Sequence, residues 1–351
     1  MIRNSLSIDL VEPVVYLRGH PKDKHTPNLL RGIIRIGLVH PVHIESVTIQ
    51  FIGTAKTLWP EASQHWDKQI LVDSVIPIWR LPIYLKKGSH SIPFEILLSN
   101  ALSESIECGL GTVRYKLRCR VHLKPWSIFG AYLKADCPVV LVRLPSADTP
   151  RCITQTHLLD DDQLDIVIDS AHIAPGIPLS LSIRFSRPGF SIDQLIVKLI
   201  ERQKFHAPSK HTTRILHHEI TLDSPDPPAI VDKEEIRAVY AIPDKQTLLV
   251  HPSTTNRNIR VRHWIQVSLQ LLLPENAKRE ILLDAPITVL ENSIDDYMTL
   301  PVYQQIDNAH TNFAQDTTRP ALRMPSFWLK RFQQRYLSKH DRAPPKYNMA
   351  S

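Results

Sequence analysis

The side chains that could do chemistry in this sequence do not form a recognisable catalytic set. The densest candidate for a metal site is His217-His218-Glu219, within a chain of 17 histidines. Adjacent residues of a strand point to opposite faces, so His217 and His218 are not expected to share one metal ion. The patterns G-x-S-x-G, H-E-x-x-H and G-x-x-x-x-G-K, which mark hydrolases, zinc peptidases and phosphate-binding loops, do not occur. We therefore expect no catalytic residues, no metal site and no cofactor.

Recognition chemistry is clearer near the C-terminus, where residues 344–347 read Pro-Pro-Lys-Tyr. WW domains bind P-P-x-Y peptides because Pro344 and Pro345 favour a preformed polyproline II conformation, while Tyr347 fills a second pocket. At this composition roughly 0.06 such motifs are expected by chance. A weaker candidate is the segment Leu300-Pro301-Val302-Tyr303, which keeps only the second proline. A simple turn at the end of the folded region explains Leu300, Pro301 and Tyr303 equally well.

Residues 113–124 predict a strand with one apolar and one basic face. The cations of the basic face, at alternate positions over most of the strand, are Arg114, Lys116, Arg118, Arg120 and Lys124. Such a row spans roughly 33 Å and favours an anionic partner, either an acidic or phosphorylated protein segment or anionic lipid. The alternative is a solvated face whose cations pair with acids on neighbouring strands. Nucleic acid is disfavoured because no row of aromatic side chains accompanies the cations.

Residues 327–336 combine aromatic side chains and cations in a pattern that predicts a short basic amphipathic helix. The side chains suited to an anionic membrane interface are Trp328, Lys330, Arg331, Phe332 and Arg335. A helix packed back on the folded region, or a segment without structure, explains the pattern equally well.

The elements that must position these sites are strands. Alternation of apolar and polar residues recurs along the chain, whereas helical periodicity is nearly absent before residue 300. The chain has 351 residues, 28 prolines, only 10 glycines and a net charge of +7. Its four cysteines lack the short spacing of a zinc site, and neither a secretory signal nor a run of 18 apolar residues is found. We expect an all-β protein of a reducing compartment with free thiols.

The pattern predicts two tandem antiparallel β-sandwiches. The first is expected over residues 1–147, a linker over 148–162, the second sandwich over 163–298 and a flexible basic tail over 299–351. Two prolines and three consecutive aspartates near the linker interrupt the alternation. Residues 224–244 are rich in proline and charge, which predicts a long surface loop.

Several strands, in order and spacing, resemble those of the arrestin fold and in detail the fungal α-arrestins, the arrestin-related trafficking adaptors. The N-terminal half has residues 30–32 (Leu-Arg-Gly), 44–53 (Ile-Glu-Ser-Val-Thr-Ile-Gln-Phe-Ile-Gly) and 59–61 (Trp-Pro-Glu). It also has 111–117 (Gly-Thr-Val-Arg-Tyr-Lys-Leu). The C-terminal half has residues 197–202, 259–263 and 285–290 in the same order as the family. The resemblance covers residues 6 to about 290, and each sandwich would then be immunoglobulin-like.

The resemblance implies a cytosolic adaptor. Such a protein binds the cytosolic side of a membrane transporter or receptor and recruits the WW domains of a HECT-type ubiquitin ligase, which promotes ubiquitination, endocytosis and sorting of the cargo. It is recruited peripherally to plasma or endosomal membranes. The basic strand would then contact cargo or anionic lipid. The alternative is an arrestin-like scaffold in signalling or vesicle trafficking, for example in ambient-pH sensing, without ligase recruitment.

Overall fold

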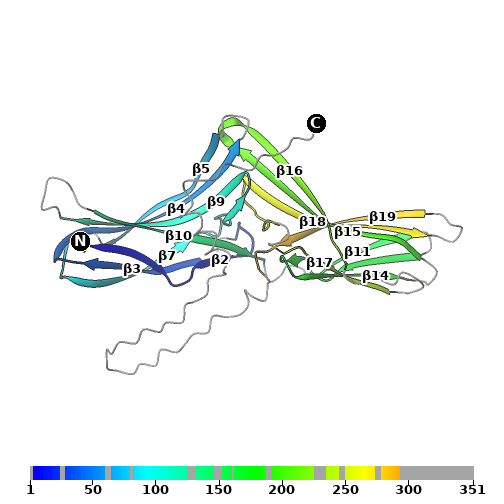
Figure 1. The fold of residues 1–351 in the computed structure, drawn as a ribbon, viewed down its shortest axis with the longest axis horizontal. Helices are drawn as coiled ribbons and strands as arrows, with labels where there is room; N and C mark the ends of the chain where they lie inside the picture. The colour runs from blue at the N-terminus through cyan, green and yellow to red at the C-terminus, as the bar shows by residue number, and fades with distance from the viewer. Residues whose placement is uncertain are drawn as a thin grey trace, which may run out of the picture. The chain divides into compact units, whose positions relative to one another are not determined.

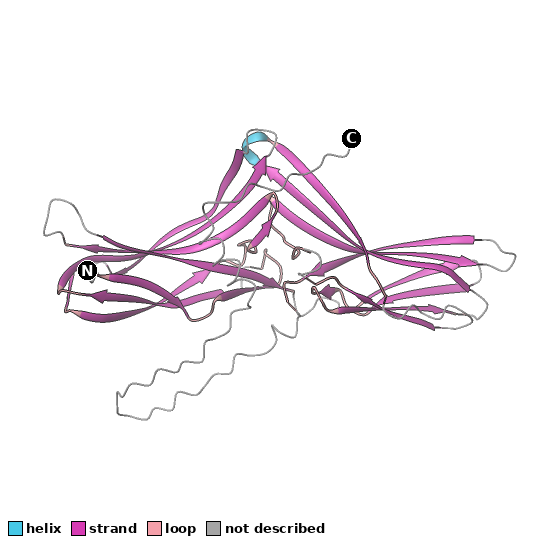
Figure 2. Cartoon of the chain, in the orientation of Figure 1, coloured by secondary structure: helices cyan, strands magenta, loops and turns pink. Residues whose placement is uncertain are grey.

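A computed structural model describes residues 3–23, 28–59, 65–79, 82–124, 132–145, 152–159, 162–186, 191–224, 235–244, 250–272 and 278–292. Residues 1–300 form one compact unit. The regular elements of the described residues are β-strands and one 3₁₀ turn, η1 (Pro208–Lys210), drawn in cyan in Figure 2. The prediction of an all-β protein is confirmed.

The first sandwich is built from two sheets. One has the strand order β1 (Ser5–Leu10), β3 (Asn28–Leu38) and β7 (Gly88–Leu98). The other has the order β2 (Val14–Arg18), β10 (Tyr132–Leu144), β9 (Gly111–Leu123), β4 (Val42–Trp59) and β5 (His65–Trp79). Two short strands, β6 (Ile83–Leu85) and β8 (Ile106–Cys108), pair with β4 and β9 respectively and complete a seven-stranded sheet. Strand β2 runs parallel to β10, while the other pairs are antiparallel.

The second sandwich repeats this two-sheet plan (Figure 1). Its four-stranded sheet has the order β11 (Ile153–Leu159), β12 (Asp162–Ile168), β14 (Pro178–Phe185) and β17 (Glu235–Ala241). Its five-stranded sheet has the order β13 (His172–Ile173), β19 (Lys278–Val289), β18 (Ile259–Leu272), β15 (Ser191–Ala207) and β16 (Thr212–Thr221).

Alternating side chains build a separate apolar core in each sandwich. On β9 the inward residues Val113, Tyr115, Leu117, Cys119 and Val121 are buried, as the alternation predicts. On β18 the inward residues Ile265, Val267, Leu269 and Leu271 are fully buried in the second core. Burial of these faces supplies the main driving force for the fold.

Apolar and polar contacts join the two sandwiches. Phe205 of β15, with Ile259 and Val261 of β18, is buried in the core of the first sandwich. A Cβ atom added to Gly111 at the start of β9 would lie 2.7 Å from the Ile259 Cδ1 atom, so the absence of a side chain permits this approach. The Asp67 carboxylate accepts hydrogen bonds from the Ser209 backbone N–H and hydroxyl at 2.9 and 2.7 Å.

Two predictions from the sequence were wrong. The segment 148–162 is not a linker throughout, because β11 pairs antiparallel with β12 and forms an edge of the second sandwich. Residues 224–244 are not a loop throughout, because β17 pairs with β14 at the opposite edge. Both strands lie at sheet edges. Strand β17 does alternate, with Ile236, Ala238 and Tyr240 buried, but this pattern is short and follows a proline-rich stretch. Among the described residues, no helix is long and apolar enough to cross a membrane.

Candidate functional site

The predicted basic strand is β9, and its cations lie on the outward face of the seven-stranded sheet. The intervening side chains from Val113 to Leu123 point into the core. The five predicted cations therefore do lie in a row on one face of the sheet.

Three of the five cations are paired with carboxylates. Lys116 and Arg118 both donate to Asp136 of β10, with Lys116 Nζ at 3.0 Å and Arg118 Nε at 2.9 Å. Arg114 donates to Glu107 of β8 at 3.0 Å. The hydrogen bond from Arg118, with those from Lys116, lowers the pKa of Asp136 to about 2. Arg114, Lys116 and Arg118 thus have the carboxylate partners on neighbouring strands that the alternative describes.

The rest of this face carries cations that pair with no carboxylate among the described residues. We call Arg120, Lys124 and Lys134 the cationic centre. Arg120 lies directly opposite Lys134 of β10, and both side chains are exposed. In the part of the chain that the structure describes, neither of them nor Lys124 forms an ion pair. Like charges placed directly opposite one another destabilise a sheet by about 0.2–1 kcal/mol. An anion bound between Arg120 and Lys134 would relieve this repulsion.

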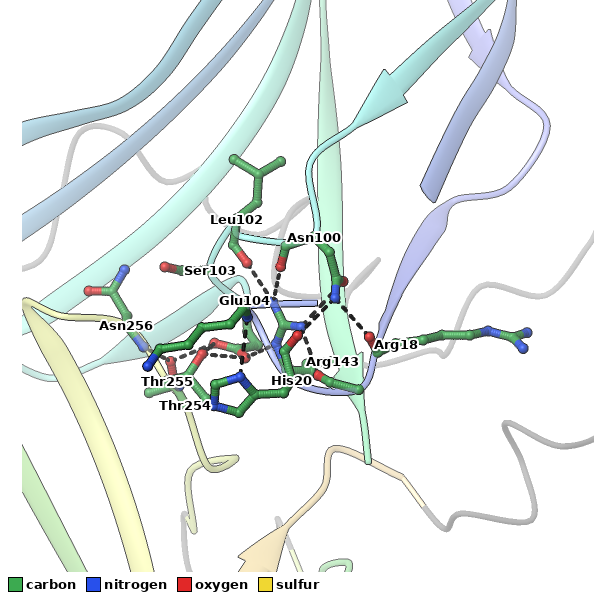
Figure 3. Close-up of polar contacts among 12 residues, drawn as sticks. Arg18, His20, Asn100, Leu102, Ser103, Glu104, Arg143, Thr254, Thr255 and Asn256 are labelled. Atoms are coloured by element: carbon green, nitrogen blue, oxygen red, sulfur yellow. Dashed lines mark hydrogen bonds and ion pairs between the residues drawn. The ribbon is translucent and has the colours of Figure 1, made fainter. Parts of the chain in front are cut away.

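A buried polar centre anchored on Arg143 and Glu104 lies where the two sandwiches meet (Figure 3). The Arg143 guanidinium donates to the Glu104 carboxylate at 2.7 Å, and the two side chains are only 9% and 8% exposed. Its other N–H groups donate to the backbone carbonyls of Gly19, Asn100 and Leu102 at 2.7–3.0 Å. Every contact is charge-assisted and shielded from water, so this centre is rigid.

Glu104 also forms hydrogen bonds with residues of the second sandwich. Its carboxylate accepts hydrogen bonds from the hydroxyl groups of Thr254 and Thr255 and from the Thr255 backbone N–H, at 2.9–3.1 Å. Thr254 and Thr255 belong to the irregular segment 250–258, which precedes β18. No sequence motif marks this centre, and its one local signal is a charged residue between Val142 and Leu144 in an apolar strand.

A second buried carboxylate holds the start of the same segment. Glu201 of β15 accepts hydrogen bonds from the His251 backbone N–H and ring at 2.8 and 3.0 Å, and contacts the His263 ring of β18 at 3.1 Å. Gln203 also donates to Glu201. Burial raises the pKa of Glu201, but the hydrogen bonds from His251 and His263 outweigh it and hold that pKa below the ordinary value. In the sequence, this cluster is marked only by the polar residues Glu201 and Gln203 at inward positions of β15.

The cluster around Glu201 has a structural role. The Ser253 hydroxyl lies 2.9 Å from the His263 Nδ1 atom, which completes a Ser-His-Glu row. However, the same hydroxyl oxygen accepts the Val289 backbone N–H at 2.9 Å, and the His263 side chain is fully buried. Both buried carboxylates therefore serve to hold the segment 250–258 between the sandwiches.

Other reactive side chains are arranged as follows. His217 Nε2 lies 3.3 Å from a Glu219 oxygen, and the described residues hold no group of three side chains that could bind a metal ion. Cys108, Cys119, Cys137 and Cys152 are free thiols, as predicted. Burial raises the pKa of Cys119 to about 12, which makes that thiol unreactive near neutrality.

The candidates in the C-terminal tail lie outside the described residues. These are the motif Pro344, Pro345 and Tyr347, the weaker candidate Leu300, Pro301 and Tyr303, and the membrane candidates Trp328, Lys330, Arg331, Phe332 and Arg335. They stay predictions.

Comparison with known proteins identifies the second sandwich. Residues 163–294 match the family model described as the arrestin (or S-antigen) C-terminal domain. The second sandwich is an arrestin C-terminal domain. The match begins inside β12 and extends past β19, so it covers both of its sheets except the edge strand β11.

Whole-chain relatives agree with this arrestin domain. An arrestin-related trafficking adapter of Schizosaccharomyces pombe is 24% identical over 375 residues, which cover 86% of this chain and 56% of the relative. A second such adapter from that yeast is 23% identical and covers 88% of this chain and 74% of the relative. A HECT-type ubiquitin ligase-interacting protein of Emericella nidulans is 20% identical, with coverages of 80% and 52%. The resemblance to fungal arrestin-related adaptors is confirmed, and the chain spans about half the length of several of these relatives.

Proposed function

We propose that this protein is an adaptor that brings a HECT-type ubiquitin ligase to a membrane transporter or receptor. The observation that carries the proposal is an arrestin C-terminal domain in a chain similar to proteins named for interaction with that ligase class. In this proposal the chain contributes binding and no chemistry. It acts in the cytoplasm, is recruited to plasma or endosomal membranes, and promotes ubiquitination, endocytosis and sorting of its cargo.

Ligase recruitment is assigned to Pro344, Pro345 and Tyr347. Two adjacent prolines lower the entropy lost on binding, and the tyrosine adds an aromatic anchor. The segment Leu300, Pro301 and Tyr303 serves as a weaker second contact. Holding ligase and cargo on one chain raises the local concentration of cargo lysines near the ligase.

Cargo contact is assigned to the part of the basic strand whose cations lack carboxylate partners. Arg120 and Lys134 supply two adjacent positive charges, and Lys124 extends the centre along β9. Lys116 and Arg118 are already engaged by Asp136, so they contribute less. An acidic segment of the cytosolic part of a transporter or receptor is the fitting partner.

Pull-down of the full chain by isolated WW domains of a HECT-type ligase tests the recruitment step. We expect Tyr347→Ala to reduce binding at least tenfold, because the tyrosine pocket is left empty. The matched control Tyr303→Ala should reduce it much less. Equal capture of the wild type and Tyr347→Ala, or capture of neither, would favour the scaffold without ligase recruitment.

Binding of an acidic peptide, measured by fluorescence anisotropy at low salt, tests the cargo contact. Removing both unpaired charges with Arg120→Gln and Lys134→Gln should weaken binding several-fold. The control pair Arg114→Gln and Lys116→Gln removes the same charge from cations that have partners, and should have a smaller effect. Equal losses in the two double variants would contradict the assignment to Arg120 and Lys134.

A further inference from the structure

The outward side of the edge strand β5 carries three large apolar side chains that are exposed. Trp66, Ile70 and Val75 pair with the outward residues Leu58, Thr54 and Gln50 of β4, so all three lie on the outward face of the sheet. Their exposed fractions are 44%, 59% and 61%. Large apolar side chains gathered on one solvent-facing strand mark an interaction surface.

This apolar row is turned away from the contact between the two sandwiches. The alternate residues Asp67 and Gln69 point to the opposite side of β5 and bond to Ser209 and Asn258 of the second sandwich. Since successive side chains of a strand alternate between faces, Trp66 and Ile70 face solvent. The interface that holds the sandwiches together does not cover them.

Two lysines and one carboxylate lie among the apolar side chains, and the carboxylate, Asp73, accepts a hydrogen bond from the Gln50 amide. Lys68 lies between Trp66 and Ile70 on β5 and directly opposite Lys56 of β4, and both lysines are exposed. Neither forms an ion pair within the described residues. Two like charges directly opposite one another cost stability unless an anionic partner covers them. We name Lys56, Trp66, Lys68, Ile70 and Val75 the β4–β5 strip.

We propose that the β4–β5 strip docks on an anionic lipid bilayer. Tryptophan and aliphatic side chains on one sheet face enter the headgroup and acyl boundary, while the flanking lysines attract anionic headgroups. An acidic peptide would match the lysines and leave the three exposed apolar side chains in water. A second copy paired along β5 would bring further lysines toward Lys68. An anionic lipid surface would both pair with the two lysines and cover the exposed apolar side chains. This contact does not depend on cargo or ligase binding.

Co-sedimentation of the full chain with vesicles tests the strip. We compare vesicles of phosphatidylcholine alone with vesicles that contain 30% phosphatidylserine, a fraction of about one third chosen for strong anionic charge. The wild type should bind the anionic vesicles and release them as salt is raised. Trp66→Ser with Ile70→Ser, and separately Lys56→Gln with Lys68→Gln, should each weaken binding about tenfold or more.

Matched variants separate the strip from general effects. Leu158→Ser removes an apolar side chain that is 75% exposed on β11, and Lys86→Gln with Lys87→Gln removes two exposed charges before β7. Both controls should bind vesicles like the wild type, and so should Tyr347→Ala, whose effect is confined to WW binding. Trp328→Ser with Phe332→Ser tests the tail in the same assay.

Three outcomes would overturn the proposal. One is a wild type that binds neutral and anionic vesicles equally. Another is full retention of binding by both strip variants, with loss of binding only in the tail variant. The third is a wild-type dimer in light scattering that dissociates in the strip variants, since the strip would then join two copies.

Discussion

At the scale of single residues, two buried carboxylates hold the segment 250–258, and one of them, Glu104, bonds to it from the other sandwich. Glu104 binds Arg143 within the first sandwich and Thr254 and Thr255 from the second. Glu201 binds His251 at the start of the same segment and His263 of β18. A buried charge is tolerated only when it is fully hydrogen-bonded, and both carboxylates meet this condition.

Loss of the Arg143 guanidinium should be strongly destabilising. Arg143→Met leaves the Glu104 carboxylate buried without its cation, and we expect the free energy of unfolding to fall by about 3–5 kcal/mol. Urea unfolding followed by tryptophan fluorescence measures this loss. Thr255→Val, which removes only a hydroxyl, should cost about 1–2 kcal/mol. A loss below about 1 kcal/mol for Arg143→Met would contradict the role of this ion pair.

His263 should make the protein less stable in mild acid. Burial lowers the pKa of His263 in the folded state, whereas the unfolded residue titrates near its ordinary pKa of about 6.5. Above that pH neither state binds the proton. As pH falls below it, the unfolded chain takes up a proton that the folded chain excludes, so the free energy of unfolding decreases. The groups facing the ring are Glu201, His251 and Ser253.

Urea unfolding between pH 7.5 and 5.5 checks this pH dependence, the range being about one unit either side of the ordinary histidine pKa. His263→Gln should show a smaller loss of stability over the range than the wild type. His217→Gln is the control for the loss of a histidine, because His217 is half exposed and lies outside the buried cluster. Identical slopes for the wild type and His263→Gln would show that His263 does not cause the effect.

At the scale of elements, the alternation of apolar and polar residues predicts which side chains of a strand point inward. The neighbouring strands decide which outward charges are paired. On β9 three of the five cations pair with two carboxylates, Asp136 of β10 and Glu107 of β8. On the outward face of the five-stranded sheet, Arg202 of β15 lies directly opposite Arg262 of β18, and Lys204 lies opposite Arg260. The pairing of the edge strands β11 and β17 with β12 and β14 joins separate segments of the chain, so no local pattern encodes it.

Replacing one of the opposed arginines should stabilise the second sandwich. Arg262→Glu converts a like-charge cross-strand pair with Arg202 into an opposite-charge pair, and we expect about 0.2–1 kcal/mol of added stability. The thermal unfolding midpoint at low salt measures it. Arg237→Glu, at an arginine already bonded to Glu235, should instead lower the midpoint. A lower midpoint for Arg262→Glu would show that Arg262 already has a stabilising partner.

At the scale of the whole molecule, the described part of residues 1–300 is two sandwiches that share buried contacts. Phe205, Ile259 and Val261 of the second sandwich are buried in the core of the first. The polar contacts of Glu104 and Asp67 run alongside them. Separation would expose apolar surface and remove the hydrogen bonds that Thr254 and Thr255 donate to Glu104, so the sandwiches are energetically coupled.

This coupling predicts a single cooperative unfolding transition for the two sandwiches. We expect one calorimetric peak whose enthalpy equals the van't Hoff enthalpy. Thr254→Val with Thr255→Val removes the hydroxyl bonds to Glu104 and should broaden or split the peak. Two separate peaks in the wild type would contradict the coupling.

The sequence by itself determined the fold class, the inward and outward faces of most strands and the Pro-Pro-Lys-Tyr motif, because each depends on residues adjacent in the chain. Only the tertiary structure decided which cations of β9 keep an unpaired charge, since their partners come from other strands. It also decided that Glu104 meets Thr255, 151 residues away. The partner of a buried polar group can lie anywhere in the chain, so a periodic pattern in the local sequence does not reveal it.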